Sequence, residues 1–301
     1  MLSGLMVKEG DKIGIISTAR WIAEEDIEFA DGIIKSWGLV PVYGKSIHAR
    51  KDQFAGDDEI RRTDLQKFLD DPEIRAIICA RGGYGTIRII EDIDFTGFMK
   101  APKWVCGFSD ITILHAHIND KLGISTIHST MPVNFIKNSV EALLTLKYAL
   151  FGKTTDFNLP ANALNIFGNA EGEIIGGNLS ILYSLLGTKF GFSTGDKILF
   201  IEDVDEYLYH IDRMMMSLKL AGKLQNLKGL IVGGMSDMKD NLIPFGKTVE
   251  EIILDHVGDL NIPVCFGFPA GHIDDNRAMI LKRKIKLEVS AAGSSIHYLQ
   301  K

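Results

Sequence analysis

Apolar residues in the first half of the chain form short continuous runs separated by longer stretches with helical periodicity. The continuous runs lie at residues 12–17, 39–43, 76–80, 104–108 and 125–128, and the helical stretches at 22–36, 60–69, 86–93 and 111–121. Strands that are apolar at consecutive positions are buried on both faces, as in a parallel sheet covered by helices. The pattern therefore predicts an α/β domain with a doubly wound parallel sheet.

The second half begins after a predicted helix at 140–150 and a non-periodic stretch at 151–167, which is typical of a surface linker. Helical stretches at 179–186, 207–220 and 249–256 then alternate with strand-like runs at 197–201, 229–232 and 264–268. Alternating segments at 284–290 and 295–299 predict an antiparallel hairpin. We therefore predict an N-terminal α/β domain over 1–151, a linker over 152–170 and a C-terminal α/β domain with a mixed sheet over 171–301.

Composition excludes several classes of protein. The 301 residues are 46% hydrophobic and 24% charged, which indicates a globular chain with a core and not a disordered one. A net charge of -6 without a dense Lys/Arg run disfavours nucleic acids and anionic membranes as partners. Cys79, Cys106 and Cys265 lie in apolar runs, which predicts core positions in a reducing compartment. With no leader sequence visible, we expect a cytoplasmic protein.

Candidate chemistry gathers at the predicted carboxyl ends of strands, where parallel α/β sheets bind their ligands. The run ARGGYG at 80–85 offers backbone N–H groups to an oxyanion or a phosphate, although a tight turn explains it equally well. The run GFSD places Ser109 at a strand-to-helix bend, where the N–H of Asp110 would face an oxyanion. A helix N-cap is the alternative interpretation of this second run.

Two further strand ends supply an acid and a base. Glu202 follows an apolar strand in FIEDVDE, and a carboxylate at the end of a buried run needs a partner such as a histidine. His272 ends GFPAGH on a turn and is the best candidate base among the eight histidines. A serine, an acid, a histidine and backbone donors together indicate a hydrolase, with its active site at the interface of the two domains.

Six motifs occur in order along the chain: GDKIGIIS, ARGGYG, GFSD, EGEIIGGNLS, FIEDVDEYLYHIDRM and GFPAGH. Together they resemble the LD-carboxypeptidases of the serine peptidase S66 family over nearly the whole chain. The resemblance implies that Ser109 is the nucleophile, Glu202 the acid, with Glu206 as its rival, and His272 the base. It also implies backbone oxyanion donors at Gly83 and Asp110, and substrate-binding roles for Arg81 and Tyr84.

The activity that the resemblance implies is hydrolysis of the amide between an L-configured diaminopimelate or lysine and a terminal D-alanine. The substrate would be a murein tetrapeptide in cell-wall recycling, with no cofactor or metal, and the protein would be a homodimer. A microcin C-type immunity peptidase, which cleaves aminoacyl-nucleotide amides, is the alternative within the family.

Other classes of protein stay open at this point. A nucleotide-binding kinase would use the GGYGT turn at 82–86, and a non-catalytic binding protein would use two α/β domains. A metal site from His115, His117 and His128 is disfavoured, because the first two lie two residues apart on one predicted helix and face different ways.

Overall fold

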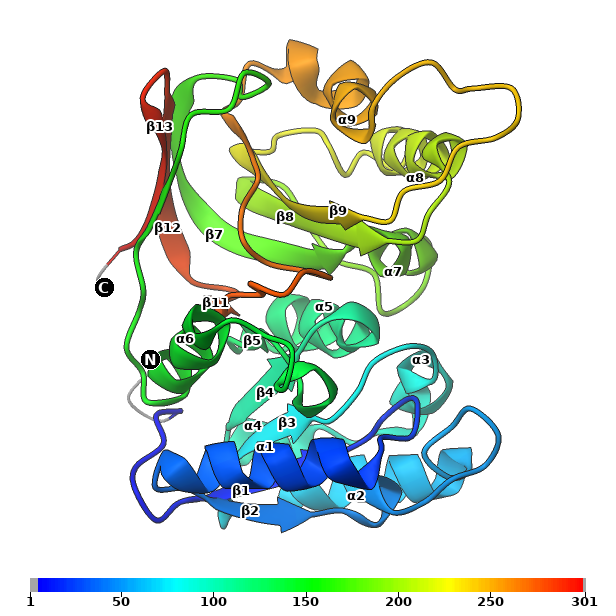
Figure 1. Ribbon diagram of the computed structural model, residues 1–301, viewed down its shortest axis with the longest axis vertical. Coiled ribbons are helices and arrows are strands. Elements are labelled where there is room, and N and C mark those ends of the chain that lie inside the picture. The colour runs from blue at the N-terminus through cyan, green and yellow to red at the C-terminus, as the bar shows by residue number, and fades with distance from the viewer. Residues whose placement is uncertain (1–4, 300–301) are drawn as a thin grey trace. The chain divides into compact units, whose positions relative to one another are not determined.

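The computed structural model describes residues 5–299 and divides into two compact units (Figure 1). The first unit runs to Thr154 and also includes Asp274–Ile280. The second contains Thr155–Ile273 and the chain from Leu281 onward. The chain therefore passes between the units at three points. No helix among the described residues is long and apolar enough to cross a membrane.

The first unit is built on a six-stranded sheet in the order β11-β5-β4-β3-β1-β2. Its strands are β1 (Lys12–Ile16), β2 (Val40–Tyr43), β3 (Ile74–Cys79), β4 (Trp104–Gly107), β5 (Ile127–His128) and β11 (Met279–Ile280). Neighbouring strands run parallel, except that β11 is antiparallel to β5. The predicted strands of the first half are all present, and the α/β class is confirmed.

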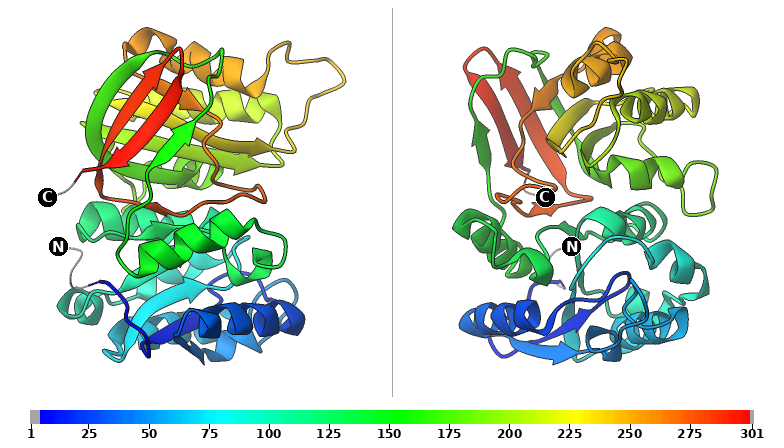
Figure 2. Two further views of the ribbon diagram at one scale, coloured as in Figure 1. Left: turned by 60° about the vertical axis from the view of Figure 1, so that its left-hand side comes forward. Right: turned by 45° about the vertical axis from the view of Figure 1, so that its right-hand side comes forward.

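Helices cover both faces of this sheet. They are α1 (Glu24–Ser36), α2 (Asp58–Asp70), α3 (Thr86–Ile89), α4 (Thr96–Lys100), α5 (Thr112–Lys121) and α6 (Val140–Leu150), with short 3₁₀ turns η2 (Lys45–Ile47), η3 (Ile90–Asp92), η4 (Ser109–Ile111) and η5 (Pro132–Asn134). Figure 2 shows α1 and α6 on one face and α2 and α5 on the other. The sheet is thus doubly wound, and β3 and β4 are buried. The single helix predicted at 86–93 is instead α3 followed by η3.

The winding direction changes between β1 and β3. Within the sheet, β2 lies next to β1 on one side and β3 lies next to β1 on the other side, so the chain crosses past β1 between β2 and β3. The loops after β1 and β3 therefore lie next to each other, and the N–H of Arg20 donates to the carbonyl of Gly82 at 3.5 Å. Ligands of open α/β sheets bind at such a switch point, outside the carboxyl ends of the strands.

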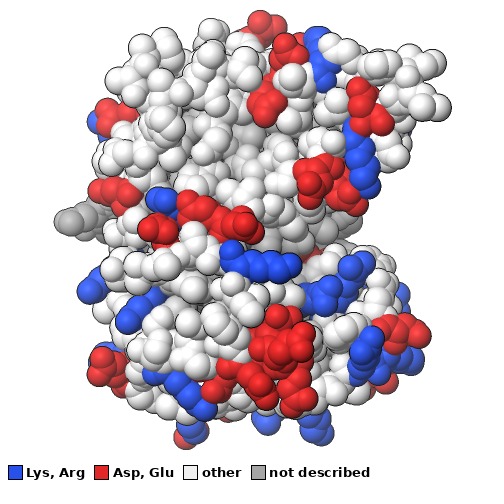
Figure 3. All heavy atoms as spheres, viewed as in Figure 1, with Lys and Arg blue, Asp and Glu red and all other residues white. Residues whose placement is uncertain are grey.

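Acidic side chains gather over α1 on the face shown in Figure 3. The first turn of that helix carries Glu24, Glu25 and Asp26, and its N-cap, Ala23, makes no side-chain hydrogen bond. Carboxylates near a helix N-terminus interact favourably with the helix dipole. Helix stabilisation accounts for this patch.

The second unit has a seven-stranded mixed sheet in the order β10-β9-β8-β7-β12-β13-β6. The strands are β6 (Phe157–Leu159), β7 (Gly168–Asn178), β8 (Lys197–Val204), β9 (Gly229–Ser236), β10 (Val264–Phe266), β12 (Lys284–Ser290) and β13 (Gly293–Tyr298); the helices are α7 (Leu179–Ser184), α8 (Leu208–Leu220) and α9 (Val249–Val257), with the 3₁₀ turn η6 (Gly258–Leu260). The half from β7 to β10 is parallel and the rest is antiparallel. The predicted mixed sheet and C-terminal hairpin are both confirmed.

The second sheet curls until its two edges approach each other. The ring of Phe157 in β6 lies 4.9 Å from that of Phe268, which follows β10 at the opposite edge. Ile166 and Val264 exchange two backbone hydrogen bonds of 3.0 Å beside this contact. The curl encloses an aromatic core that includes Phe200 of β8.

The predicted boundaries differ from these units in two places. The stretch assigned to a linker, 152–170, contains β6 and the first residues of β7. The stretch assigned to the second domain, 171–301, contains β11, which pairs with β5 of the first unit. A two-residue strand carries too little periodicity to be seen in a sequence, and its partner is fixed only by the tertiary fold.

Candidate active site

Ser109 occupies a tight turn at the carboxyl end of β4. Its backbone has φ 60°, in the left-handed region that non-glycine residues seldom adopt, and Gly107 before it has φ 150°. Ser109 is the first residue of η4, which leads directly into α5. Among the described residues of its own unit, the hydroxyl of Ser109 has no hydrogen-bond partner. This is the backbone geometry of a strained strand-to-helix bend that exposes a nucleophile, and the N-cap alternative receives no support, since no described side chain caps η4.

The loop after β3 presses its glycines against Ser109. A Cβ added at Gly82 would lie 3.1 Å from the Cβ and 3.3 Å from the Oγ of Ser109. Gly83 has φ 111°, a conformation that favours glycine. The backbone at Gly82 therefore runs beside the hydroxyl, and the N–H of the next residue, Gly83, is the predicted oxyanion donor.

Asp110 ties the same loop to the turn that carries Ser109. Its carboxylate accepts a 2.8 Å hydrogen bond from the N–H of Thr86, at the start of α3, and its buried Oδ1 has no partner in the described part of the unit. Burial raises the pKa of Asp110 to about 6, against the opposing effects of the Thr86 hydrogen bonds and of the charges of Arg61 and Arg20. The side chain of Asp110 thus fixes the turn, while its backbone N–H is the predicted oxyanion donor.

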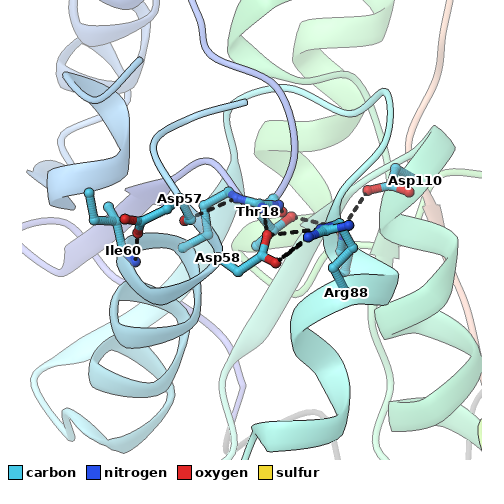
Figure 4. Close-up of polar contacts among 8 residues, drawn as sticks. Thr18, Asp57, Asp58, Ile60, Arg88 and Asp110 are labelled. Carbon is cyan, nitrogen blue, oxygen red and sulfur yellow. Dashed lines mark hydrogen bonds and ion pairs between the residues drawn. The ribbon is translucent and has the colours of Figure 1, made fainter. Parts of the chain in front are cut away.

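A network of polar contacts that includes Thr18, Asp58 and Arg88 supports this region (Figure 4). Arg61 of α2 is fully buried, donates to the carbonyls of Thr18 at 3.0 Å and Asp57 at 3.3 Å, and forms an ion pair with Asp58. Asp58 in turn pairs with Arg88 at 2.6 Å. The network holds the loop after β1 against α2 and α3, and sequence reasoning missed it because its members are scattered along the chain.

In the second unit, His272 and Glu202 form a hydrogen-bonded pair. The Nδ1 of His272 lies 2.8 Å from Glu202 Oε2, which also accepts the backbone N–H of His272 at 3.2 Å. Glu202 is fully buried, whereas 22% of the His272 side chain is exposed. Burial opposes a charged imidazole, but the carboxylates of Glu202 and Asp203 outweigh it and raise the pKa of His272 above 6.5.

Glu202 lies inside β8 and not after it, which corrects the strand end predicted at residue 201. The strand continues to Val204 and buries both Glu202 and Asp203. Asp203 accepts hydrogen bonds from Asn178 Nδ2 at 2.9 Å and from the N–H groups of Ser180 and Val204. Burial, followed by the charge of Glu202, raises the pKa of Asp203 to about 7.

Asn178 and Asp203 are therefore members of the acid–histidine cluster that the sequence analysis did not single out. The signal was present in two of the quoted motifs, since Asn178 ends EGEIIGGN and Asp203 follows Glu202. Asn178 also caps α7 through a bond from the N–H of Ile181. It links the helix start to the acidic strand end.

The remaining predicted residues lie in distinct places. Arg81 donates its Nη1 to the carbonyl of Trp21 at 3.0 Å, and Tyr84 packs its ring against Phe54. Glu206 contacts the Nδ1 of His210 at 2.5 Å, so His272 is paired with Glu202 and not with this rival.

The cysteines, and two of the histidines considered for a metal site, His115 and His128, are buried in the core. Cys79, Cys106 and Cys265 are free and buried, as expected. His115 bonds to the carbonyl of Gly107 at 2.8 Å, and burial lowers its pKa to about 4. Within residues 5–299, no three His, Cys, Asp or Glu side chains are placed to hold a metal ion.

The candidate residues form two groups, one in each unit. Ser109 lies with Gly82, Gly83 and Asp110 in the first unit, and Glu202 lies with His272 in the second. A strained serine turn beside backbone N–H groups, and a buried acid that orients a histidine, are the features of hydrolases.

The chain belongs to the LD-carboxypeptidase family. The family's N-terminal domain matches residues 13–129 and its C-terminal domain matches residues 171–287, so the protein is a peptidase, a hydrolase. It is 34% identical over 294 residues to the probable murein peptide carboxypeptidase of Bacillus subtilis, a match that covers 94% of this chain and 91% of that protein.

Solved structures share the fold over the same extent. The crystal structure of muramoyltetrapeptide carboxypeptidase from Oxalobacter formigenes is 27% identical, with a TM-score of 0.87, over 96% of this chain and 99% of that one. The microcin C7 self immunity protein in complex with aspartyl sulfamoyl adenosine is 20% identical, with a TM-score of 0.84, over 97% of each chain. This second likeness is one of fold alone. Family membership favours the peptidase interpretation over a kinase or a binding protein.

Proposed function

We propose that the protein is a serine LD-carboxypeptidase acting on murein tetrapeptides. It hydrolyses the amide between an L-configured diaminopimelate or lysine and the terminal D-alanine. The observation that carries the proposal is the left-handed backbone of Ser109 at the end of β4, within the part of the chain that matches the family's N-terminal domain. The names of the relatives support the substrate class.

In the acylation step, Ser109 Oγ attacks the scissile carbonyl and His272 Nε2 takes the hydroxyl proton. The N–H groups of Gly83 and Asp110 stabilise the oxyanion that forms. The C–N bond then breaks, and the proton on His272 passes to the amine of the leaving D-alanine. The peptide remains on Ser109 as an ester.

In the deacylation step, His272 takes a proton from water, the hydroxide attacks the ester carbonyl, and the proton returns to Ser109 Oγ. Glu202 supports both steps because its carboxylate accepts a bond from Nδ1–H of His272. That bond selects the tautomer whose Nε2 accepts a proton, and the negative charge stabilises the imidazolium. The mechanism requires that the two units bring Ser109 and His272 to one substrate.

Arg81 and Tyr84 contact the peptide, and no cofactor takes part. The enzyme is a cytoplasmic homodimer, for which three free buried cysteines support the reducing compartment. Cell fractionation tests the location, and light scattering on the purified protein tests the dimer.

The decisive experiment uses the tetrapeptide L-Ala-γ-D-Glu-diaminopimelate-D-Ala with wild-type protein and Ser109→Ala. Release of D-alanine by the wild type alone supports both the activity and the nucleophile. Acid-quenched intact mass spectrometry should also find the wild type heavier by the tripeptide acyl group, and the variant unmodified.

Two outcomes would redirect the proposal. Equal release of D-alanine by both proteins would refute Ser109 as the nucleophile. If neither this peptide nor its lysine analogue is cleaved, aminoacyl-nucleotide amides become the next substrates to test.

A further inference from the structure

The proposed reaction requires a receptor for the substrate's free carboxylate. A carboxypeptidase acts only at a chain end, so it must recognise the carboxylate that lies one residue beyond the scissile carbonyl. Guanidinium groups bind carboxylates through paired, charge-assisted hydrogen bonds. We therefore expect an arginine beside Ser109 whose guanidinium is not already bonded.

Most arginines around the 80–85 loop are engaged. Arg61 is buried and bonded to the carbonyl of Thr18. Arg88 forms an ion pair with Asp58 at 2.6 Å. Arg81 donates to the carbonyl of Trp21 at 3.0 Å and is partly buried. Each of these three guanidinium groups already bonds within the protein, so none of them is left unengaged to receive the terminal carboxylate.

Arg20, in the loop after β1, differs from them. Its side chain is exposed, and among the described residues of its unit the guanidinium has no hydrogen-bond or ion-pair partner. The side chain lies on Gly83: a Cβ added there would be 2.6 Å from Arg20 Cδ and 2.9 Å from Arg20 Nε. Its positive charge acts across the loop. It adds to the effect of burial in lowering the pKa of Arg81, and it opposes the effect of burial on the pKa of Asp110.

Arg20 and Ser109 thus flank two successive glycines. Gly82 lies against Ser109, and Gly83 lies against Arg20. Adjacent Cα atoms are about 3.8 Å apart, and in the substrate the scissile carbonyl and the terminal carboxylate are separated only by one nitrogen and one Cα. A peptide whose carbonyl faces Ser109 and the N–H of Gly83 therefore has its carboxylate within reach of Arg20.

The backbone around Arg20 is held in place while its side chain is exposed. Its N–H donates to the carbonyl of Gly82 at 3.5 Å, and the carbonyl of the preceding Ala19 accepts from Ala55 at 3.0 Å. This loop lies at the switch point between β1 and β3, where open α/β sheets bind ligands. A fixed main chain carrying an unengaged guanidinium is suited to binding an anion.

We propose that Arg20 binds the terminal carboxylate of the leaving D-amino acid and so restricts cleavage to the chain end. This inference rests on the proposed carboxypeptidase function. Arg20 is a substrate-binding residue in this account, and it takes no part in proton transfer.

The test compares the tetrapeptide with its C-terminal amide, whose terminal charge is removed. We expect wild type to prefer the acid, and Arg20→Gln to lower kcat/KM for the acid about 10- to 100-fold, mainly through KM. The same variant should cleave the amide within about twofold of wild type. Arg20→Lys should retain part of the preference. Arg50→Gln is the matched control, because Arg50 is exposed but stacks on Trp21 at 3.6 Å, away from Gly83.

The possible results distinguish failure of the Arg20 inference from failure of the proposed carboxypeptidase function. Loss of the acid preference in Arg20→Gln alone supports the inference. An unchanged preference, or an equal loss on acid and amide, overturns it while leaving the carboxypeptidase function standing. If wild type releases no D-alanine at all, the proposed function fails first, whatever Arg20 does.

Discussion

Gly271 packs directly on the side chain of Glu202. A Cβ added at Gly271, where φ is 112°, would lie 2.6 Å from Glu202 Oε2 and 2.7 Å from Glu202 Cβ. The glycine before the candidate base therefore leaves the room that the candidate acid occupies.

Substituting Gly271→Ala should displace Glu202 and lower kcat by about tenfold or more, since misplacement by about 1 Å near a reacting group costs on the order of 10²-fold. It should also lower the free energy of unfolding by about 2 kcal/mol. Gly267→Ala is the matched control, because Gly267 has φ 79° but no described atom within 4 Å of an added Cβ. Kinetics and urea unfolding measure both effects, and equal losses of activity would contradict this account.

The strained backbone of Ser109 should appear as a cost in stability. Ser109→Gly removes the left-handed penalty and is expected to raise the free energy of unfolding by about 1 kcal/mol, while Ser109→Ala keeps the penalty. Both variants should lose kcat by about 10³-fold or more. Paired urea melts and D-alanine assays test this, and a Gly variant no more stable than the Ala variant would show that the turn is unstrained.

The pH dependence of activity should follow His272. Only the neutral imidazole accepts a proton, so kcat/KM falls as pH drops through its pKa, which the carboxylates hold above 6.5 against the effect of burial. Glu202→Gln removes one of these carboxylates, so the acid limb should move to lower pH. The maximal rate should fall by about 10³- to 10⁴-fold because the tautomer is no longer fixed.

The rival acid offers a direct comparison for this pH profile. Glu206→Gln breaks a contact with His210 and not with His272, so its acid limb should coincide with that of wild type. A limb that moved in this variant and stayed in Glu202→Gln would reverse the assignment of the acid.

Asp110 should leave a signature in the pH dependence of stability. Burial raises its pKa from 3.8 to about 6, so between these values the folded protein keeps a proton that the unfolded chain releases. Stability from this group is therefore lost as pH rises from about 4 to 6. Asp110→Asn has no such proton, and its stability relative to wild type should increase by about 2–3 kcal/mol over that range.

Urea unfolding at a series of pH values from acidic to neutral measures this difference. Activity at neutral pH is a useful companion measurement, because the Asp110→Asn substitution changes only the side chain and keeps the backbone N–H assigned to the oxyanion. A difference between variant and wild type that stays constant across the series would contradict the raised pKa.

The sequence alone determined the α/β class, most strands of the first sheet, the C-terminal hairpin, and the residues at which candidate chemistry gathers. These features depend on local order: consecutive apolar positions mark buried parallel strands, and glycine, serine or histidine at a strand end marks a turn that faces ligands. The motifs also contained the family resemblance, which the domain matches confirm.

Tertiary structure alone decided the features that depend on residues far apart in the chain. The pairing of β11 with β5 joins Met279 to His128, and the extension of β8 that buries Glu202 depends on its neighbours β7 and β9. The approach of Arg20 to Gly83 needs two loops to meet at the switch point. Such contacts are set by the packing of whole sheets and helices, and periodicity along a sequence carries no record of them.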